Sequence, residues 1–99
     1  MTRWAVIFKD DPGMMDIRAD KARRDAHVAY AEAHPELLIG GGLKPGPEAD
    51  FSGALWIVEA ETREAVDQLV RADPFYEPDL RSFESFTWGK ILEDRQVLL

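Results

Sequence analysis

Arg71-Ala72-Asp73-Pro74-Phe75-Tyr76 is the stretch that decides how the chain is arranged. Just before it, Val66, Leu69 and Val70 follow the i, i+3, i+4 spacing that is typical of one buried helix face. The next position on that face is Asp73, and the proline after it is expected to end the helix. An acidic side chain is therefore predicted to point inward at a helix end that already carries partial negative charge. Such an acid requires a cation or a hydrogen-bond donor beside it.

Length and composition indicate one small domain. The chain has 99 residues, of which 45% are hydrophobic, which is enough for a core and suits a single domain over residues 1–99 (core 3–88, tail 89–99). A net charge of -7 argues against nucleic acid or an anionic membrane surface as partner. The absence of cysteine excludes disulfides and thiolate chemistry. With neither a signal-peptide pattern nor a membrane-length apolar run, we expect a soluble, cytoplasmic domain.

The order of predicted elements is strand, helix, strand, strand, helix, strand. Hydrophobic alternation and turn residues place them at residues 3–9, 16–34, 36–40, 51–60, 62–72 and 80–88, with Asp16 and Thr62 as helix N-caps. This order predicts an α+β, ferredoxin-like βαββαβ fold with a mostly antiparallel four-stranded sheet and both helices on one face. Because several strands are apolar on both sides, we expect a second copy to cover the other face as a homodimer. The apolar end of the tail is expected to dock on a neighbour.

The first predicted helix has two kinds of face. Five alanines, at positions 19, 22, 26, 29 and 33, form a small-residue face that is expected to lie close to the sheet. A polar stripe runs beside it and contains Arg23, His27, Tyr30 and His34. The chain has no other histidine, so His27 and His34 are the imidazoles that could donate a hydrogen bond to Asp73.

His27 is the better placed of the two, since it lies mid-helix where the end of the second helix could reach it. An imidazole within about 3 Å of a carboxylate is oriented by it and suits acid–base chemistry near neutral pH. Two simpler interpretations stay open on spacing alone. An aspartate before proline often only forms a turn, and a mid-helix histidine is often an ordinary exposed or core residue.

The glycine run Gly40-Gly41-Gly42 follows a short stretch, Leu37–Ile39, that is predicted to be a buried strand. Three glycines permit a bulge or the close approach of a ligand. Their amides could cradle an anion, but the run lacks the Gly-Lys-Ser/Thr ending of a P-loop. We therefore expect a strand bulge that is compatible with a pocket wall.

Four short motifs, in this order and spacing, resemble the YCII-related (YciI-like) family. They are Ala26-His27-Val28-Ala29-Tyr30, Leu38 to Leu43, Gly53 with Val58 to Thr62, and Ala72-Asp73-Pro74-Phe75. The resemblance covers about residues 3–88. It implies a ferredoxin-like fold that dimerises through the sheet as an α+β barrel. It also implies a His–Asp active-site pair, which falls here on His27 and Asp73.

These observations lead to a first hypothesis of a small cofactor-independent enzyme in which His27, oriented by Asp73, transfers protons. Proton shift, elimination or isomerisation on a small polar molecule suits a lone His–Asp pair, since no nucleophile lies beside it. The residues expected to contact substrate are Arg23, Tyr30, Gly41, Gly42, Leu43 and Phe75. A metal is not expected, because His27 and His34 are about 10 Å apart by helix rise, and nothing in the sequence calls for a cofactor. The alternatives are a non-catalytic ligand-binding or interaction module and, by fold analogy alone, a cofactor-free oxygenase.

Overall fold

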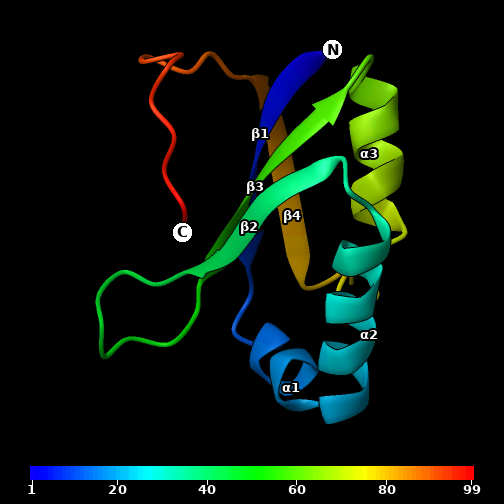
Figure 1. The fold of residues 1–99 in the computed structure, drawn as a ribbon. Coiled ribbons are helices and arrows are strands. Elements are labelled where there is room, and N and C mark those ends of the chain that lie inside the picture. Colours follow the sequence, from blue (N-terminus) through cyan, green and yellow to red (C-terminus); the bar gives the residue numbers. More distant parts are fainter.

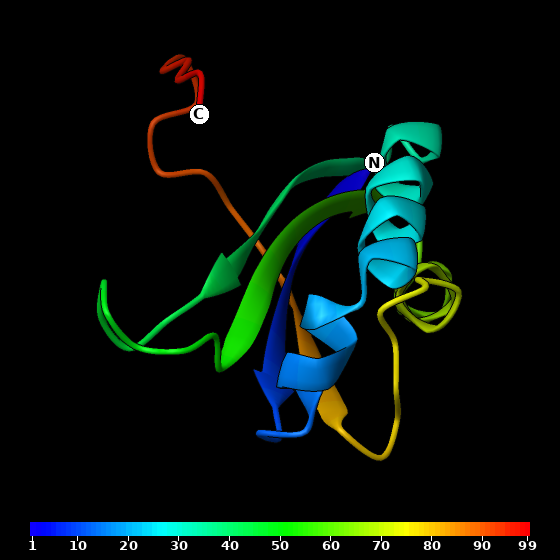
Figure 2. The ribbon, with the colours of Figure 1, turned by 90° about the horizontal axis from the view of Figure 1, so that it is seen from below.

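The protein forms one four-stranded antiparallel sheet with all helices on one face (Figure 1). The computed structural model describes all 99 residues. Along the chain the elements are β1 (Thr2–Asp10), α1 (Met14–Ala19), α2 (Lys21–Ala33), β2 (Leu37–Leu43), β3 (Gly53–Ala60), α3 (Arg63–Arg71) and β4 (Arg81–Thr87). The sheet order is β2-β3-β1-β4. This is the predicted ferredoxin-like α+β arrangement, and the view from below shows the helices on one side of the sheet and the C-terminal segment on the other (Figure 2).

The core lies between the sheet and α3. Alternate residues of β1 (Trp4, Val6 and Phe8) point to this side and are at most 7% exposed. They meet Trp56 and Val58 of β3 and the helix face predicted from Val66, Leu69 and Val70. Burying side chains of this size contributes about 1.5–3 kcal/mol each. Thr62 caps α3 as predicted, because its hydroxyl accepts a hydrogen bond from the Ala65 amide.

The other face of the sheet carries apolar side chains that nothing in one copy covers fully. Ala5 of β1 is flanked by Ile57 and Phe86, its partners on β3 and β4, so the three share this face. Phe86 is 49% exposed and Ile39 of β2 is 40% exposed. The apolar face that the strand patterns predicted is therefore present.

The prediction of one helix over residues 16–34 is wrong, because the segment contains two helices that meet at Asp20. The backbone of Asp20 is extended, with φ -74° and ψ 111°, and its side chain accepts a hydrogen bond from the Arg23 amide. Asp20 therefore ends α1 and caps α2. Asp16, the predicted cap, lies inside α1, which begins after Gly13.

The orientation predicted for the alanine face is also wrong. All five alanines are exposed, and α2 has no fully buried residue. The polar stripe faces inward instead: Arg23 and His27 bond to residues just after α3, and Tyr30 bonds to the last turn of α3. Hydrogen bonds of this kind contribute about 0.5–1.5 kcal/mol each and hold the helix in this orientation.

The second strand differs from its prediction in length and in burial. β2 continues through all three glycines to Leu43, and its irregularity falls between Leu37 and Ile39 rather than at the glycines. Leu38 and Ile39 are exposed on this edge strand, and Ile39 lies opposite Ile57 on the uncovered face of the sheet. Beside it, Gly53 permits a close backbone approach: a Cβ at this position would lie 2.1 Å from the Phe8 carbonyl oxygen.

Candidate active site

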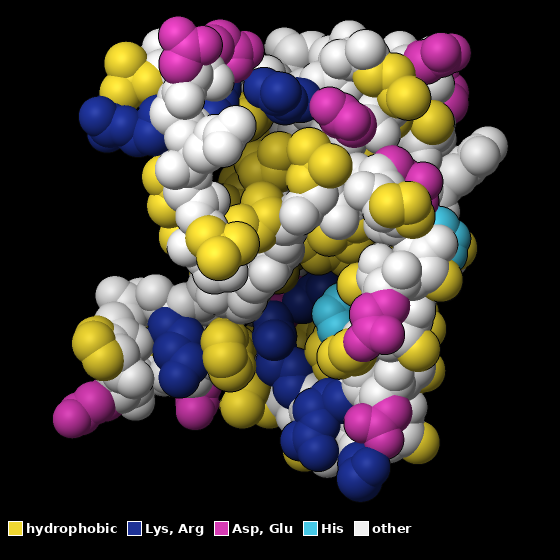
Figure 3. Space-filling view, in the orientation of Figure 1, with side chains coloured by type: hydrophobic (Ala, Val, Ile, Leu, Met, Phe, Trp, Pro, Cys, Tyr) yellow, Lys and Arg dark blue, Asp and Glu magenta, His cyan; other side chains and the backbone are white.

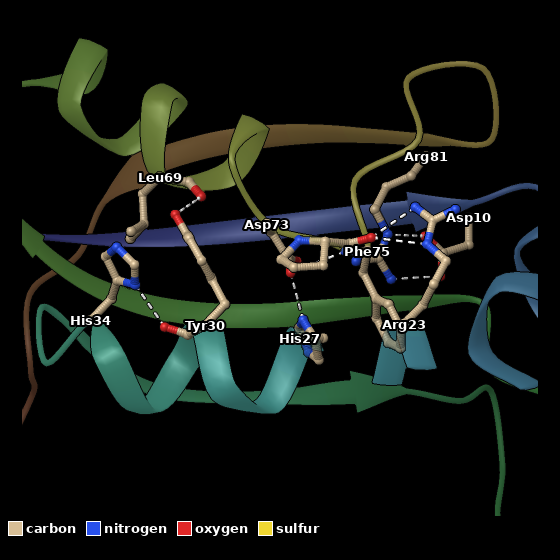
Figure 4. Close-up of polar contacts among 10 residues, drawn as sticks. Asp10, Arg23, His27, Tyr30, His34, Leu69, Asp73, Phe75 and Arg81 are labelled. Atoms are coloured by element: carbon tan, nitrogen blue, oxygen red, sulfur yellow. Dashed lines mark hydrogen bonds and ion pairs between the residues drawn. The ribbon is translucent and has the colours of Figure 1, made fainter. Parts of the chain in front are cut away.

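His27 of α2 and Asp73, just beyond α3, face each other in the folded chain (Figure 4). The Nδ1 atom of His27 lies 2.7 Å from Oδ1 of Asp73. The same oxygen accepts a hydrogen bond from the backbone amide of Phe75 at 3.1 Å. Because a carboxylate only accepts hydrogen bonds, this contact requires the hydrogen on Nδ1, and the neutral form of the ring then has its free lone pair on Nε2.

Burial differs between the two partners. The Asp73 side chain is 1% exposed and the His27 side chain is 26% exposed. The inward orientation predicted for Asp73 is thus present. An acid at a helix C-terminus is unfavourable by itself, and here the imidazole and the amide of Phe75 supply the donors that it requires.

The loop after α3 holds the imidazole from a second side. The ring of Phe75 stacks on His27 with 4.2 Å between centroids and 6° between planes. Arg23 fixes this loop, since its Nε and Nη2 donate to the Pro74 carbonyl and its Nη1 lies 2.7 Å from the Glu77 carboxylate. The ring is therefore oriented by its edge and by one face, which favours one position for Nε2.

A small cavity of about 140 Å³ opens beside His27. It is lined by Arg18, His27, Ala31, Leu37, Gly40, Gly41, Gly42, Ala54, Trp56, Phe75 and Arg81. Figure 3 shows the hollow between sheet and helices, with a histidine beside a group of basic side chains. Glycine at position 40 lets β2 pass close to the Trp56 ring, because a Cβ there would lie 2.9 Å from it.

A buried ionic cluster forms the floor of the site. Arg81 donates from Nε and Nη2 to the two carboxylate oxygens of Asp10 at 2.6 and 2.9 Å. Arg18 donates from Nη2 to the same carboxylate and to the Gly53 carbonyl. Burial would raise the pKa of Asp10, but hydrogen bonds from Arg81 and Arg18 outweigh it and hold that pKa below its ordinary value.

Of the residues that the sequence predicted to contact substrate, Gly41, Gly42 and Phe75 line the cavity. Arg23 and Tyr30 do not line it. Burial first, and then the charges of Asp73 and Glu36, raise the pKa of the Tyr30 phenol, whose hydroxyl donates to the Leu69 carbonyl at 2.8 Å. Leu43 lines a groove on the opposite face of the sheet.

Sequence reasoning missed the two arginines, Arg18 and Arg81. Asp10 is the last residue of β1 and pairs in register with Arg81, the first residue of β4. An acid at the end of the first predicted strand and a base at the start of the last one indicate an ion pair between them. No comparable signal marks Arg18, because the helix that carries it was predicted with the wrong boundaries.

The structure contains no group of three or more histidine, aspartate or glutamate side chains placed to hold a metal ion. None of its helices has the length and apolar character needed to cross a membrane.

Comparison with known proteins assigns the class. The YCII-related domain matches residues 2–88, so the chain belongs to the YCII-related domain family. A search of curated proteins finds no match. A solved structure that is similar is 5-chloro-2-hydroxyhydroquinone dehydrochlorinase (TftG) from Burkholderia phenoliruptrix AC1100, in complex with 2,5-dihydroxybenzoquinone. The two share 27% sequence identity and a TM-score of 0.73, over 88% of this chain and 93% of that one.

Proposed function

We propose that this protein is an acid–base enzyme that catalyses elimination or a related proton transfer on a small single-ring molecule. The observation that carries the proposal is the geometry of His27, which lines the cavity while its Nδ1 is bonded to buried Asp73. That arrangement leaves Nε2 as the ring nitrogen available to a ligand. A base that is positioned in one tautomer contributes about 10²–10⁴-fold to a proton-transfer step.

In the proposed step, Nε2 of His27 removes an acidic proton from the substrate, and the electron pair released expels the leaving group as an anion. The net change is loss of HX, and Asp73 stabilises the imidazolium that forms. The similar structure supports elimination, since that protein is a dehydrochlorinase. No cofactor is required to balance this step.

The size of the cavity supports a single ring. Its volume of about 140 Å³ is close to that of an engineered cavity of about 150 Å³ that binds benzene. The rings of Trp56 and Phe75 supply flat apolar walls. A polar chain or a two-ring molecule would extend out of this space.

Exchange of ring protons tests the proposal with probe molecules that need not be the natural substrate. In D2O, the protein is expected to accelerate deuterium incorporation into the ring C–H positions of 2,5-dihydroxybenzoquinone, followed by NMR, and to release chloride from 5-chloro-2-hydroxyhydroquinone. His27→Ala should lower both rates by about 10²–10⁴-fold, with His34→Ala as the matched control. Parent-like rates in His27→Ala would remove the proposal. Ligand binding with no exchange or chloride release by the parent would favour the non-catalytic binding module instead.

We further propose that two copies pair through the uncovered sheet face. Support comes from the exposed apolar side chains of that face, including Ile39, Leu43 and Phe86. Small domains often gain stability by covering such surfaces with a second copy.

A further inference from the structure

The cavity beside His27 is lined by basic groups alone among its charged or titratable side chains. Arg18, Arg81 and His27 contribute to its wall, and no aspartate or glutamate does. The whole chain has 19 acidic and 12 basic residues, so this local composition opposes the overall charge. The two acids nearby, Asp10 and Asp73, are buried behind these basic groups, with side chains 1% exposed.

The two arginines use their donors differently. Arg81 is 3% exposed and directs Nε and Nη2 at Asp10 as a bidentate pair. Arg18 makes its hydrogen bonds through Nη2 alone. Its Nε is buried without an acceptor, and its side chain remains 14% exposed. Nη1 also has no acceptor and is not among the buried atoms, so it is the donor of Arg18 that a ligand can reach.

The surroundings of Arg18 place its free donors next to the glycine strand. A Cβ at Gly42 would lie within 2.6 Å of the Phe51 ring and 3.5 Å from Nη1 of Arg18, so glycine lets both side chains pack against this strand. The ring of Phe51 covers the guanidinium, with 4.6 Å from Cζ to the ring centroid. Asp10 is shared between two guanidiniums, so one positive charge of the cluster has no carboxylate of its own.

We propose that Arg18 is the binding residue for an ionised ring oxygen, and that the ligand class of this cavity is a single-ring phenolate or enolate. The inference rests on the proposed function only in placing the substrate in this cavity. A negatively charged oxygen at Nη1 would accept from a donor that has no partner within the chain, and it would balance the excess charge of the Arg18–Asp10–Arg81 cluster. Charge-assisted hydrogen bonds of this kind are about twice as strong as neutral ones. The anion would be held next to His27, which lines the same cavity.

Binding of 4-nitrophenol tests this inference without turnover, because its ionisation changes its visible spectrum near neutral pH. In titrations over a range of pH, the parent is expected to bind the phenolate more tightly than the neutral phenol, which makes the bound phenol ionise at a lower pH than the free one. Arg18→Gln should weaken phenolate binding at least about tenfold and leave binding of the neutral phenol little changed. Arg24→Gln is the matched control, since Arg24 is exposed on α2 and the substitution changes the net charge equally.

Urea unfolding of Arg18→Gln checks that the fold persists, which is expected because Asp10 keeps its bidentate partner Arg81. Arg18→Lys, which keeps the charge and loses the fork of donors, should bind with intermediate affinity. Equal phenolate affinity in parent and Arg18→Gln, or no phenolate binding by the parent at millimolar concentration, would overturn the anion site. Proton exchange by His27 is measured in a separate experiment. Loss of the anion site would therefore leave the proposed enzyme function standing, and loss of proton exchange would leave the anion site standing.

Discussion

The imidazole of His27 and the ring of Phe75 are stacked almost in parallel, 4.2 Å apart, and Phe75 itself is 6% exposed. The stack restricts the rotation of the His27 ring, which contacts within α2 alone would not restrict. Aromatic pairs of this kind contribute about 0.5–1.5 kcal/mol beyond their buried area.

Phe75→Leu is therefore expected to destabilise the protein by about 1–2 kcal/mol and to lower the proton-exchange rate of 2,5-dihydroxybenzoquinone by more than the stability loss explains. Urea unfolding gives the first quantity and NMR exchange the second. Phe83→Leu, which removes a ring of β4 outside the cavity, is the control. If Phe75→Leu kept the parent exchange rate, the stack would have no part in positioning His27.

Asp73→Asn tests which nitrogen of His27 carries the hydrogen. An asparagine amide can donate to Nδ1, which would move the ring hydrogen to Nε2 and remove the lone pair that faces the ligand. We expect exchange activity to fall about 10²–10⁴-fold. Long-range ¹H–¹⁵N NMR reads the tautomer directly, and His34, whose Nδ1 lies 2.6 Å from the Tyr30 carbonyl, serves as an internal reference. A His27 tautomer unchanged in Asp73→Asn would contradict this account.

Some of this site followed from sequence because short-range rules govern it. The helix spacing of Val66, Leu69 and Val70 and the proline after Asp73 determine where α3 ends and which way the acid points. The alternation in β1 and β3 likewise predicted strands to within two residues at each end. These features depend on neighbours a few positions away, so pattern reasoning reaches them.

Other features depended on contacts between distant residues. The inward turn of the polar stripe on α2 requires the Pro74 and Leu69 carbonyls as acceptors, which lie 51 and 39 positions from Arg23 and Tyr30. The chain leaves the helical conformation at Asp20, where one side-chain hydrogen bond caps α2. The residues on both sides are good helix formers, so local propensity predicts one continuous helix, and it does not anticipate a cap at this position.

The Arg18–Asp10–Arg81 cluster predicts a specific acid sensitivity. The pKa of Asp10 is lowered in the folded state, so its contribution to stability is present above the unfolded carboxyl pKa of about 3.9. That contribution is lost as the pH falls through the lower folded value. Asp10→Asn should destabilise the protein at pH 7 by about 3–5 kcal/mol, since it leaves buried guanidiniums without their carboxylate.

Urea unfolding from pH 7 to pH 2.5 checks both expectations. Asp10→Asn should show a shallower loss of stability below about pH 4 than the parent. Asp16→Asn, on the exposed side of α1, removes an equal charge and should follow the parent. Parallel acid curves for Asp10→Asn and the parent would mean that this carboxyl does not govern the acid transition.

A side chain at position 53 is expected to clash with the backbone of the neighbouring strand. A Cβ there would lie 2.1 Å from the Phe8 carbonyl oxygen, and backbone atoms in a paired strand cannot move aside as a flexible side chain can. Gly53→Ala should cost about 3 kcal/mol, or prevent folding. Gly46→Ala is the control, because no heavy atom lies within 4 Å of its Cβ position. Both effects are measured by thermal and urea unfolding, and equal stability of the two variants would contradict the close approach of β1 and β3.

The uncovered sheet face predicts the state of assembly. If two copies pair there, light scattering after gel filtration should give twice the chain mass of 11.2 kDa. Phe86→Asp should shift the protein to the monomer, because a carboxylate on this face would be buried without a partner in the dimer. Val28→Asp places the same charge on an apolar residue that is 53% exposed on the far side of α2. A parent that elutes as a monomer would overturn the pairing of two copies. A Val28→Asp variant that dissociates while Phe86→Asp does not would assign the contact to another surface, and the apolar side chains of β4 would then need a different partner.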